Sequence, residues 1–134
     1  MLLEASHPVV YDAGALIAAD SDSRRMRSLH KDAVETRRSI IVPTPVLTQV
    51  WRDGRKQARL SRLLKGCVVM PPDEAVAKHA GVLLGDSRTS DAVDAIVVAT
   101  ALILFATIVT SDSGDLARLL DAARVPFRPG LIPV

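Results

Sequence analysis

The uncharged stretch from Ala95 to Val109 lies within the sequence TSDAVDAIVVATALILFATIVTSDSGDL. It is too short to cross a bilayer, which takes roughly 20 apolar residues. Its pattern predicts a helix over residues 91–105 that is apolar on all faces, as expected of a helix buried on both sides. A short strand is expected over residues 107–110, and the turn residues Ser-Asp-Ser-Gly then begin another helix.

The remaining hydrophobic pattern extends this alternation of helices and strands along the whole chain. Strands are predicted at residues 9–11, 39–42, 67–70 and 125–134, the last one interrupted by prolines. Helices are predicted after Asp12 and at residues 22–38, 45–53 and 73–84. The helix over 22–38 carries a one-sided apolar stripe and covers the sheet, and Gly54 closes the helix over 45–53. This succession predicts an α/β fold, with helices on both faces of a mostly parallel sheet, as three layers in a single domain over residues 1–134.

Composition narrows the class of protein. The chain has 134 residues, 49% of them apolar, which suffices for one ordinary core. Cys67 is the only cysteine, so an internal disulfide and a thiolate metal site are both excluded. Residues 1–8, MLLEASHP, lack the basic and apolar regions of a signal peptide. We therefore expect a cytoplasmic protein without a membrane anchor.

Charge is distributed unevenly along the chain. Residues 1–65 hold 12 Lys and Arg against 7 Asp and Glu, whereas residues 66–134 hold 5 against 8. The segment from Arg52 to Lys65 alone carries a net charge of +5. Such a segment is either a solvated helix face or a surface that contacts phosphates, and the sequence leaves both possibilities open.

Three aspartates are predicted to meet at one edge of the sheet. Asp12 ends the first strand, Asp112 follows the strand over 107–110, and Asp94 lies in the first turn of the helix between them. Each is also explained by helix capping alone. Together, however, they would repel one another unless a cation lay between them. Oxygen ligands without a His or Cys cluster favour Mg²⁺ or Mn²⁺, a centre suited to phosphodiester hydrolysis.

Three sequence motifs carry a resemblance to a known family. YDAGALIA, DAIVVATA and VTSDSGDL occur in the order and approximate spacing found in PIN-domain nucleases, and the chain most resembles the VapC toxins of bacterial toxin–antitoxin pairs. The resemblance implies a parallel sheet between helices, Mg²⁺-dependent cleavage of RNA, a homodimer and an antitoxin partner that blocks the site.

Carried over to this sequence, the resemblance assigns the acidic metal and catalytic positions to Asp12, Asp94 and Asp112, with Asp91 and Asp115 as nearby supporting acids. The basic segment then becomes the candidate surface for RNA. Its candidate RNA contacts are Arg52, Arg55, Lys56, Arg59 and Arg62.

One family position differs. In TPVLTQVWR, Gln49 stands where the family usually has Glu, so the candidate site loses one negative charge. Asp53, expected one helical turn further on, is a possible substitute. The competing hypothesis is a degenerate PIN domain that binds RNA or an antitoxin without cutting. Other classes lack their signatures, because the chain has neither a phosphate-binding loop nor a dinucleotide fingerprint.

Overall fold

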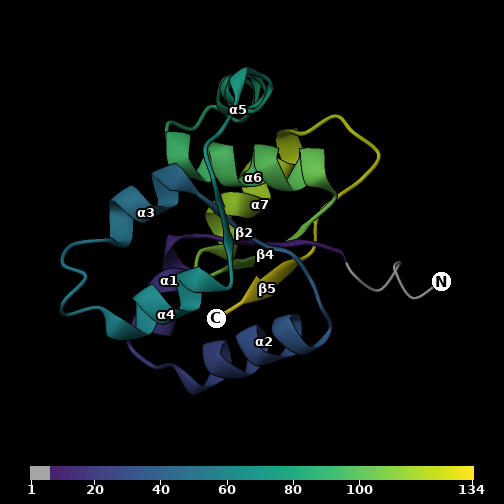
Figure 1. Cartoon of the computed structure of the whole chain (residues 1–134). Coiled ribbons are helices and arrows are strands. Elements are labelled where there is room, and N and C mark those ends of the chain that lie inside the picture. The colour runs from purple at the N-terminus through teal and green to yellow at the C-terminus, as the bar shows by residue number, and fades with distance from the viewer. Residues whose placement is uncertain (1–6) are drawn as a thin grey trace.

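The computed structural model describes residues 7–134 as one α/β domain built on a five-stranded sheet (Figure 1). The strand order is β3-β2-β1-β4-β5, and all four neighbouring pairs are parallel. The strands are β1 (Val9–Tyr11), β2 (Ile40–Pro43), β3 (Val68–Met70), β4 (Thr107–Thr110) and β5 (Leu131–Pro133). The predicted fold class is thus confirmed, and the sheet is entirely rather than mostly parallel.

Seven helices of the described residues flank this sheet. They are α1 (Ala13–Asp20), α2 (Arg24–Glu35), α3 (Thr44–Val50), α4 (Ala58–Lys65), α5 (Glu74–Ser87), α6 (Ala92–Leu104) and α7 (Ser113–Ala122). Figure 1 shows α6 and α7 on one side of the sheet and α1, α2 and α4 on the other. Helix α5 packs on α6 and α7, farther from the sheet, so this side is two helices deep.

The centre of the sheet is apolar on both faces, because helices cover both faces and neither is exposed to water. Val10 of β1 pairs with Ile41 of β2 and with Ile108 of β4, and Val10 and Ile108 are completely buried. Helix α6 buries residues 95 and 97–102, as its charge-free sequence predicts. Edge strand β3 differs, since Val68 and Val69 are exposed. Because all five strands run in the same direction, their carboxyl ends lie along one side of the sheet, the carboxyl edge. The loops to the following helices begin at this edge.

A close backbone approach joins two of these loops. A Cβ atom placed on Gly14, in the first turn of α1, would lie 1.8 Å from Ser111 Oγ and 2.9 Å from the Ser111 backbone nitrogen. Only a residue without a side chain fits there. Gly14 therefore permits the start of α1 to lie against the residue that precedes Asp112.

Helix α3 ends earlier than the sequence pattern predicted. It stops at Val50, Trp51 is extended, and Asp53 lies in the following turn rather than one helical turn after Gln49. The buried side chain of Gln57 explains the early end. Its Oε1 accepts the backbone N–H groups of Arg52 and Asp53, at 2.8 and 3.1 Å, so these groups are not available to continue the helix. The prediction that Gly54 closes this helix was accordingly wrong.

Smaller differences concern element ends and surfaces. Helix α5, predicted to end at residue 84, continues to Ser87, and Arg88 caps it in the left-handed region. The C-terminal strand covers only Leu131–Pro133. Val34, an apolar residue of the stripe predicted over residues 22–38, is exposed although its neighbour Ala33 is buried. Successive helical residues are rotated by about 100°, so Val34 lies beyond the covered face.

Two expectations concern membranes and export. None of the helices within residues 7–134 is long and apolar enough to span a bilayer. The expectation that the N-terminus holds no signal peptide rests mainly on residues 1–6, which lie outside the described residues.

The contact at Gly14 generates a first prediction. Gly14→Ala would force a methyl group into Ser111, and overpacking of this kind costs about 1–3 kcal/mol. We expect a lower free energy of unfolding, measured by urea denaturation. The variant Gly14→Ala, Ser111→Gly should recover part of this loss, because it removes the nearer of the clashing atoms.

Gly81→Ala is the matched control. Gly81 lies within α5, and an added Cβ would meet nothing within 4 Å. Alanine favours a helix over glycine, so this variant should be more stable by about 0.5–1 kcal/mol. Equal effects of the two substitutions would show that Gly14 is not required for the close approach.

Candidate metal centre

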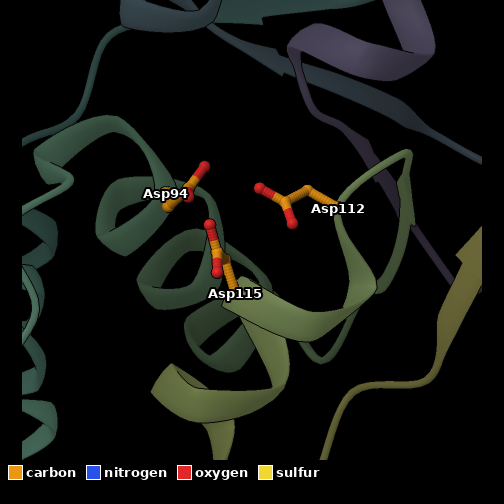
Figure 2. Close-up of side chains that lie close together, drawn as sticks. All are labelled: Asp94, Asp112 and Asp115. Atoms are coloured by element: carbon orange, nitrogen blue, oxygen red, sulfur yellow. The ribbon is translucent and has the colours of Figure 1, made fainter.

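Three carboxylates converge at the carboxyl edge of the sheet. Asp94 lies in the first turn of α6, Asp112 is the residue before α7, and Asp115 lies in the first turn of α7. Each offers one carboxylate oxygen, and these oxygens all lie within 4.8 Å of one another. Figure 2 shows the three side chains directed toward a common space. Asp94 is partly buried, whereas Asp112 and Asp115 are exposed.

The crowding of negative charge alters the protonation of these groups. The pKa of Asp94 rises to about 7, first because burial removes water and then because Asp91, Asp112, Asp12 and Asp115 repel its charged form. The pKa of Asp112 also rises, through desolvation and then through a hydrogen bond with Asp115. Without a cation, Asp94 and Asp112 therefore hold protons more tightly than isolated aspartates would.

Asp12 lies beside this group but has its own hydrogen bonds. It is 5% exposed, and its Oδ1 accepts the backbone N–H of Ala15 at 2.9 Å, which makes it the N-cap of α1. Its backbone N–H donates to the carbonyl of Val109 at 3.2 Å. Burial raises the pKa of Asp12, and repulsion by Asp112 adds to the effect. Helix capping, the alternative role suggested by the sequence, is thus real, and it coexists with a position near the other acids.

Thr110 is a residue that the sequence analysis did not single out. It is the last residue of β4 and completely buried. Its hydroxyl hydrogen-bonds the Asp12 carboxylate and accepts the backbone N–H of Asp112 at 2.8 Å. Thr110 therefore fixes two of the predicted site residues relative to each other. The signal in the sequence is a hydroxyl residue at the end of an apolar strand, two positions before an aspartate.

The supporting acids have separate positions. Asp91 is the N-cap of α6, and its Oδ1 accepts the backbone N–H of Asp94 at 3.0 Å. Asp115 belongs to the converging group itself. Asp53 forms an ion pair with Arg55, at 3.3 Å between Oδ1 and Nε. Gln49 is exposed on the last turn of α3, and its backbone carbonyl accepts a hydrogen bond from the Arg52 guanidinium.

The basic segment divides into a turn and a helix. In the turn, the Arg52 guanidinium donates to the carbonyls of Thr48 and Gln49 at the end of α3, and Lys56 is exposed. On α4, Arg59 and Arg62 line a polar cleft of about 330 Å³, together with Arg27 and Asp22. None of these basic residues lines the cavity beside Asp94 and Asp115. A substrate that contacted both regions would therefore have to extend across the surface.

The converging carboxylates fit a hard divalent cation. They provide oxygen ligands only, close enough together for one ion. Desolvation raises the pKa values of Asp94 and Asp112, and repulsion by neighbouring carboxylates adds to both shifts. Mg²⁺ is commonly bound by one or two carboxylates plus waters and substrate phosphate oxygens, so partly exposed ligands suit it. The arrangement provides a place where a cation and an anionic substrate can meet.

The chain is thus a parallel α/β domain with a candidate metal centre at the carboxyl edge of its sheet. The sequence model of the PIN domain matches residues 9–120, and the chain therefore belongs to the PIN domain family. A search of curated protein sequences finds no match.

Solved structures with the same fold include toxins of toxin–antitoxin complexes. A toxin–antitoxin complex from Klebsiella pneumoniae is 20% identical, with a TM-score of 0.66, and the match covers 92% of this chain and 95% of that one. VapBC2 from Rickettsia felis, bound to a DNA fragment from their promoter, is 14% identical with a TM-score of 0.69 over 94% and 98%. FitAcB from Neisseria gonorrhoeae is 16% identical with a TM-score of 0.63 over 92% and 96%. At these identities the likeness establishes the fold.

The raised pKa of Asp94 generates a second prediction. An unfolded aspartate has a pKa of about 3.9, whereas Asp94 in the folded chain has a pKa of about 7. The free energy of unfolding therefore falls as the pH rises from about 4 to about 7, because over this range the folded chain binds a proton at Asp94 that the unfolded chain has already lost. In EDTA, Asp94→Asn should raise the melting temperature less at pH 5 than at pH 8.

The control for this prediction is Asp86→Asn, the same chemical change at an exposed position on α5. Excess Mg²⁺ at pH 8 should stabilise the wild type more than Asp94→Asn, because the cation removes the repulsion only where the carboxylate is present. A melting difference between Asp94→Asn and the wild type that stays constant from pH 5 to pH 8 would contradict the electrostatic explanation.

Proposed function

We propose that this chain is a metal-dependent endoribonuclease, a VapC-like toxin that hydrolyses RNA phosphodiester bonds. The observation that carries the proposal is the convergence of Asp94, Asp112 and Asp115 at the carboxyl edge of a PIN-family sheet, with Asp12 next to them. Acidic side chains alone would repel the phosphates of RNA, so a nuclease site built from acids needs a positive charge. A bound divalent cation would supply this charge.

The proposed cofactor is Mg²⁺, with Mn²⁺ as a possible substitute. Asp12, Asp94 and Asp112 would hold the ion, and the closeness of Asp115 adds a fourth candidate ligand. When bound, such an ion activates a water molecule and stabilises charge that develops on the phosphate. Asp91 holds the first turn of α6 through the backbone of Asp94. The chain itself supplies ligand orientation, through helix caps and the buried hydroxyl of Thr110.

The proposed partners follow from the family and from the neighbours by fold. The neighbours in solved structures include toxin–antitoxin complexes, which supports an antitoxin that binds this chain and blocks its site. RNA is the proposed substrate, a homodimer the proposed assembly, and the cytoplasm the proposed location. The basic segment, with Arg52, Arg55, Lys56, Arg59 and Arg62, is the proposed surface for RNA phosphates away from the acidic group.

A second candidate function rests on Gln49. A neutral amide at the position where the family usually has Glu reduces the charge available to bind a cation, and this favours a PIN domain that binds without cutting. Asp53 is a poor substitute, because helix α3 ends before it and its carboxylate is paired with Arg55. We favour the nuclease, since the other acids are present and close together.

Cleavage assays separate the two functions. With Mg²⁺ or Mn²⁺ in the millimolar range, purified protein free of antitoxin should cut RNA, and Asp112→Asn should abolish cutting. Gln49→Glu should increase the rate and lower the Mg²⁺ concentration needed. Thr48→Glu is the matched control, since it adds the same charge at the neighbouring exposed position. If the wild type and Gln49→Glu both fail to cut, the non-cleaving function replaces the nuclease.

The basic segment is tested by the salt dependence of RNA binding. Each phosphate contact on a single strand contributes about 0.7 to the slope of log affinity against log salt. The triple substitution of Arg55, Arg59 and Arg62 by Ala should therefore reduce the slope by up to about 2. A triple Ala variant at Arg24, Lys78 and Arg124 removes the same charge from exposed positions elsewhere. Equal slopes in the two triple variants would show that the segment is only a solvated face.

A further inference from the structure

A small cavity opens directly beside the candidate metal centre. It has a volume of about 280 Å³, and its acidic lining comes from Asp91, Asp94 and Asp115. The same cavity is lined by two arginines, Arg88 and Arg118. The remaining lining residues are Thr89, Ser90 and Leu119. Positive and negative groups thus share one cavity at the site where a cation is proposed.

These two arginines are unusual in this part of the chain. Residues 66–134 contain only five Lys and Arg, and two of the five line this cavity. The five basic residues predicted to contact RNA all lie elsewhere. Within residues 7–134, Arg88 and Arg118 also take part in none of the ion pairs. Among the described residues, no carboxylate therefore pairs with either guanidinium group.

Local structure sets the position of each arginine. Arg88 ends α5 in the left-handed conformation, with φ of 58°, and its N–H donates to the carbonyl of Leu84. The hydroxyls of Ser87 and Thr89 are 2.8 Å apart and hold the next turn. Arg118 lies three residues after Asp115 on α7, a spacing that places both on one face of the helix. Arg88 and Arg118 thus flank the acids from two different helices.

The charges of the cavity suit a phosphate once a cation is bound. Three carboxylates and two guanidiniums leave one formal negative charge, and a divalent ion changes this to one positive charge. Guanidinium binds phosphate oxygens through paired N–H donors, which an ammonium group cannot match. The cavity is smaller than most pockets for whole small molecules, which occupy about 300–1,000 Å³. Its lining contains no aromatic residue on which a base could stack.

We propose that Arg88 and Arg118 form a subsite for one phosphate of the RNA backbone, next to the phosphate that lies at the acidic group. The inference rests on the proposed function and names residues that set where the strand lies. Because the cavity has two guanidinium donors for phosphate and no aromatic side chain on which a base could stack, this subsite fixes the position of the strand without reading its sequence. The strand therefore passes along α6 and α7 as it leaves the acidic group.

The test measures binding separately from cleavage. A fluorescein-labelled single-stranded RNA of mixed sequence is titrated with wild type, Arg88→Gln, Arg118→Gln and the double variant, by anisotropy, in Mg²⁺ and in EDTA. In Mg²⁺, each single variant should bind roughly tenfold more weakly, as expected for loss of a charged hydrogen bond. The salt slope should fall by about 0.7. Titrations in Mg²⁺ are done in the cold and read within minutes, and gel analysis identifies any titration in which the RNA has been cut, so that only intact RNA contributes to the affinities.

Two features distinguish one shared phosphate from a general charge effect. If both arginines bind the same phosphate, the double variant should lose less affinity than the product of the two single losses. Arg124→Gln removes the same charge from an exposed position outside the cavity and should change neither affinity nor slope. Arg88→Lys and Arg118→Lys keep the charge but should recover only part of the affinity.

Folding is checked by the melting temperature of each variant, and Arg118→Gln is the decisive variant if the turn at Arg88 proves sensitive. RNA affinity and slope that match wild type in Arg118→Gln and in the double variant would overturn the subsite, whatever their effect on binding to an antitoxin. A wild type that binds RNA through these arginines but cuts none would support the subsite while rejecting the nuclease. The two proposals can therefore fail independently.

Discussion

Repulsion between carboxylates at the edge of the sheet is the constraint on which the rest of this site depends. Like charges within 4.8 Å of one another destabilise the fold unless protons or a cation neutralise them. The fold places these carboxylates on rigid elements that limit how far they can move apart. Asp94 and Asp115 lie in first helical turns, where the positive end of the helix dipole favours negative charge. Thr110 hydrogen-bonds Asp12 and Asp112, and Gly14 permits the end of β4 and the start of α1 to lie close together.

The division of charge along the sequence has a spatial counterpart. The basic first half supplies the turn between α3 and α4, whereas the acidic second half supplies α6 and α7, which carry most of the acidic group. Of the candidate metal ligands, only Asp12 comes from the first half. Under the proposed function, the basic surface would attract a polyanion over a distance, and a divalent ion at the acidic group would offset the charge of the phosphate there. Long-range attraction and chemistry would then be assigned to different halves of the chain.

Most of the fold could be predicted because its signals are local. The apolar sequence of α6 and the β-branched strands at 9–11 and 107–110 specify their elements without reference to the rest of the chain. The sequence also placed Asp12, Asp94 and Asp112 near one another, because carboxyl ends of parallel strands share an edge. What it could not show depends on distant contacts. Helix α3 ends where Gln57 takes up its N–H groups, and Arg88 and Arg118 meet only after α5 and α7 pack together.

Gln57 has a consequence for how this chain can change during evolution. Its buried amide uses both ends at once, with Oε1 accepting from the backbone of the turn and Nε2 donating to Asp20 at 3.2 Å and to the carbonyl of Val50 at 3.0 Å. Surface turns usually accept inserted residues easily. An insertion between Val50 and Gln57 would break this network. The network therefore constrains the length of the turn, whereas it does not constrain which side chains the exposed residues of the turn carry.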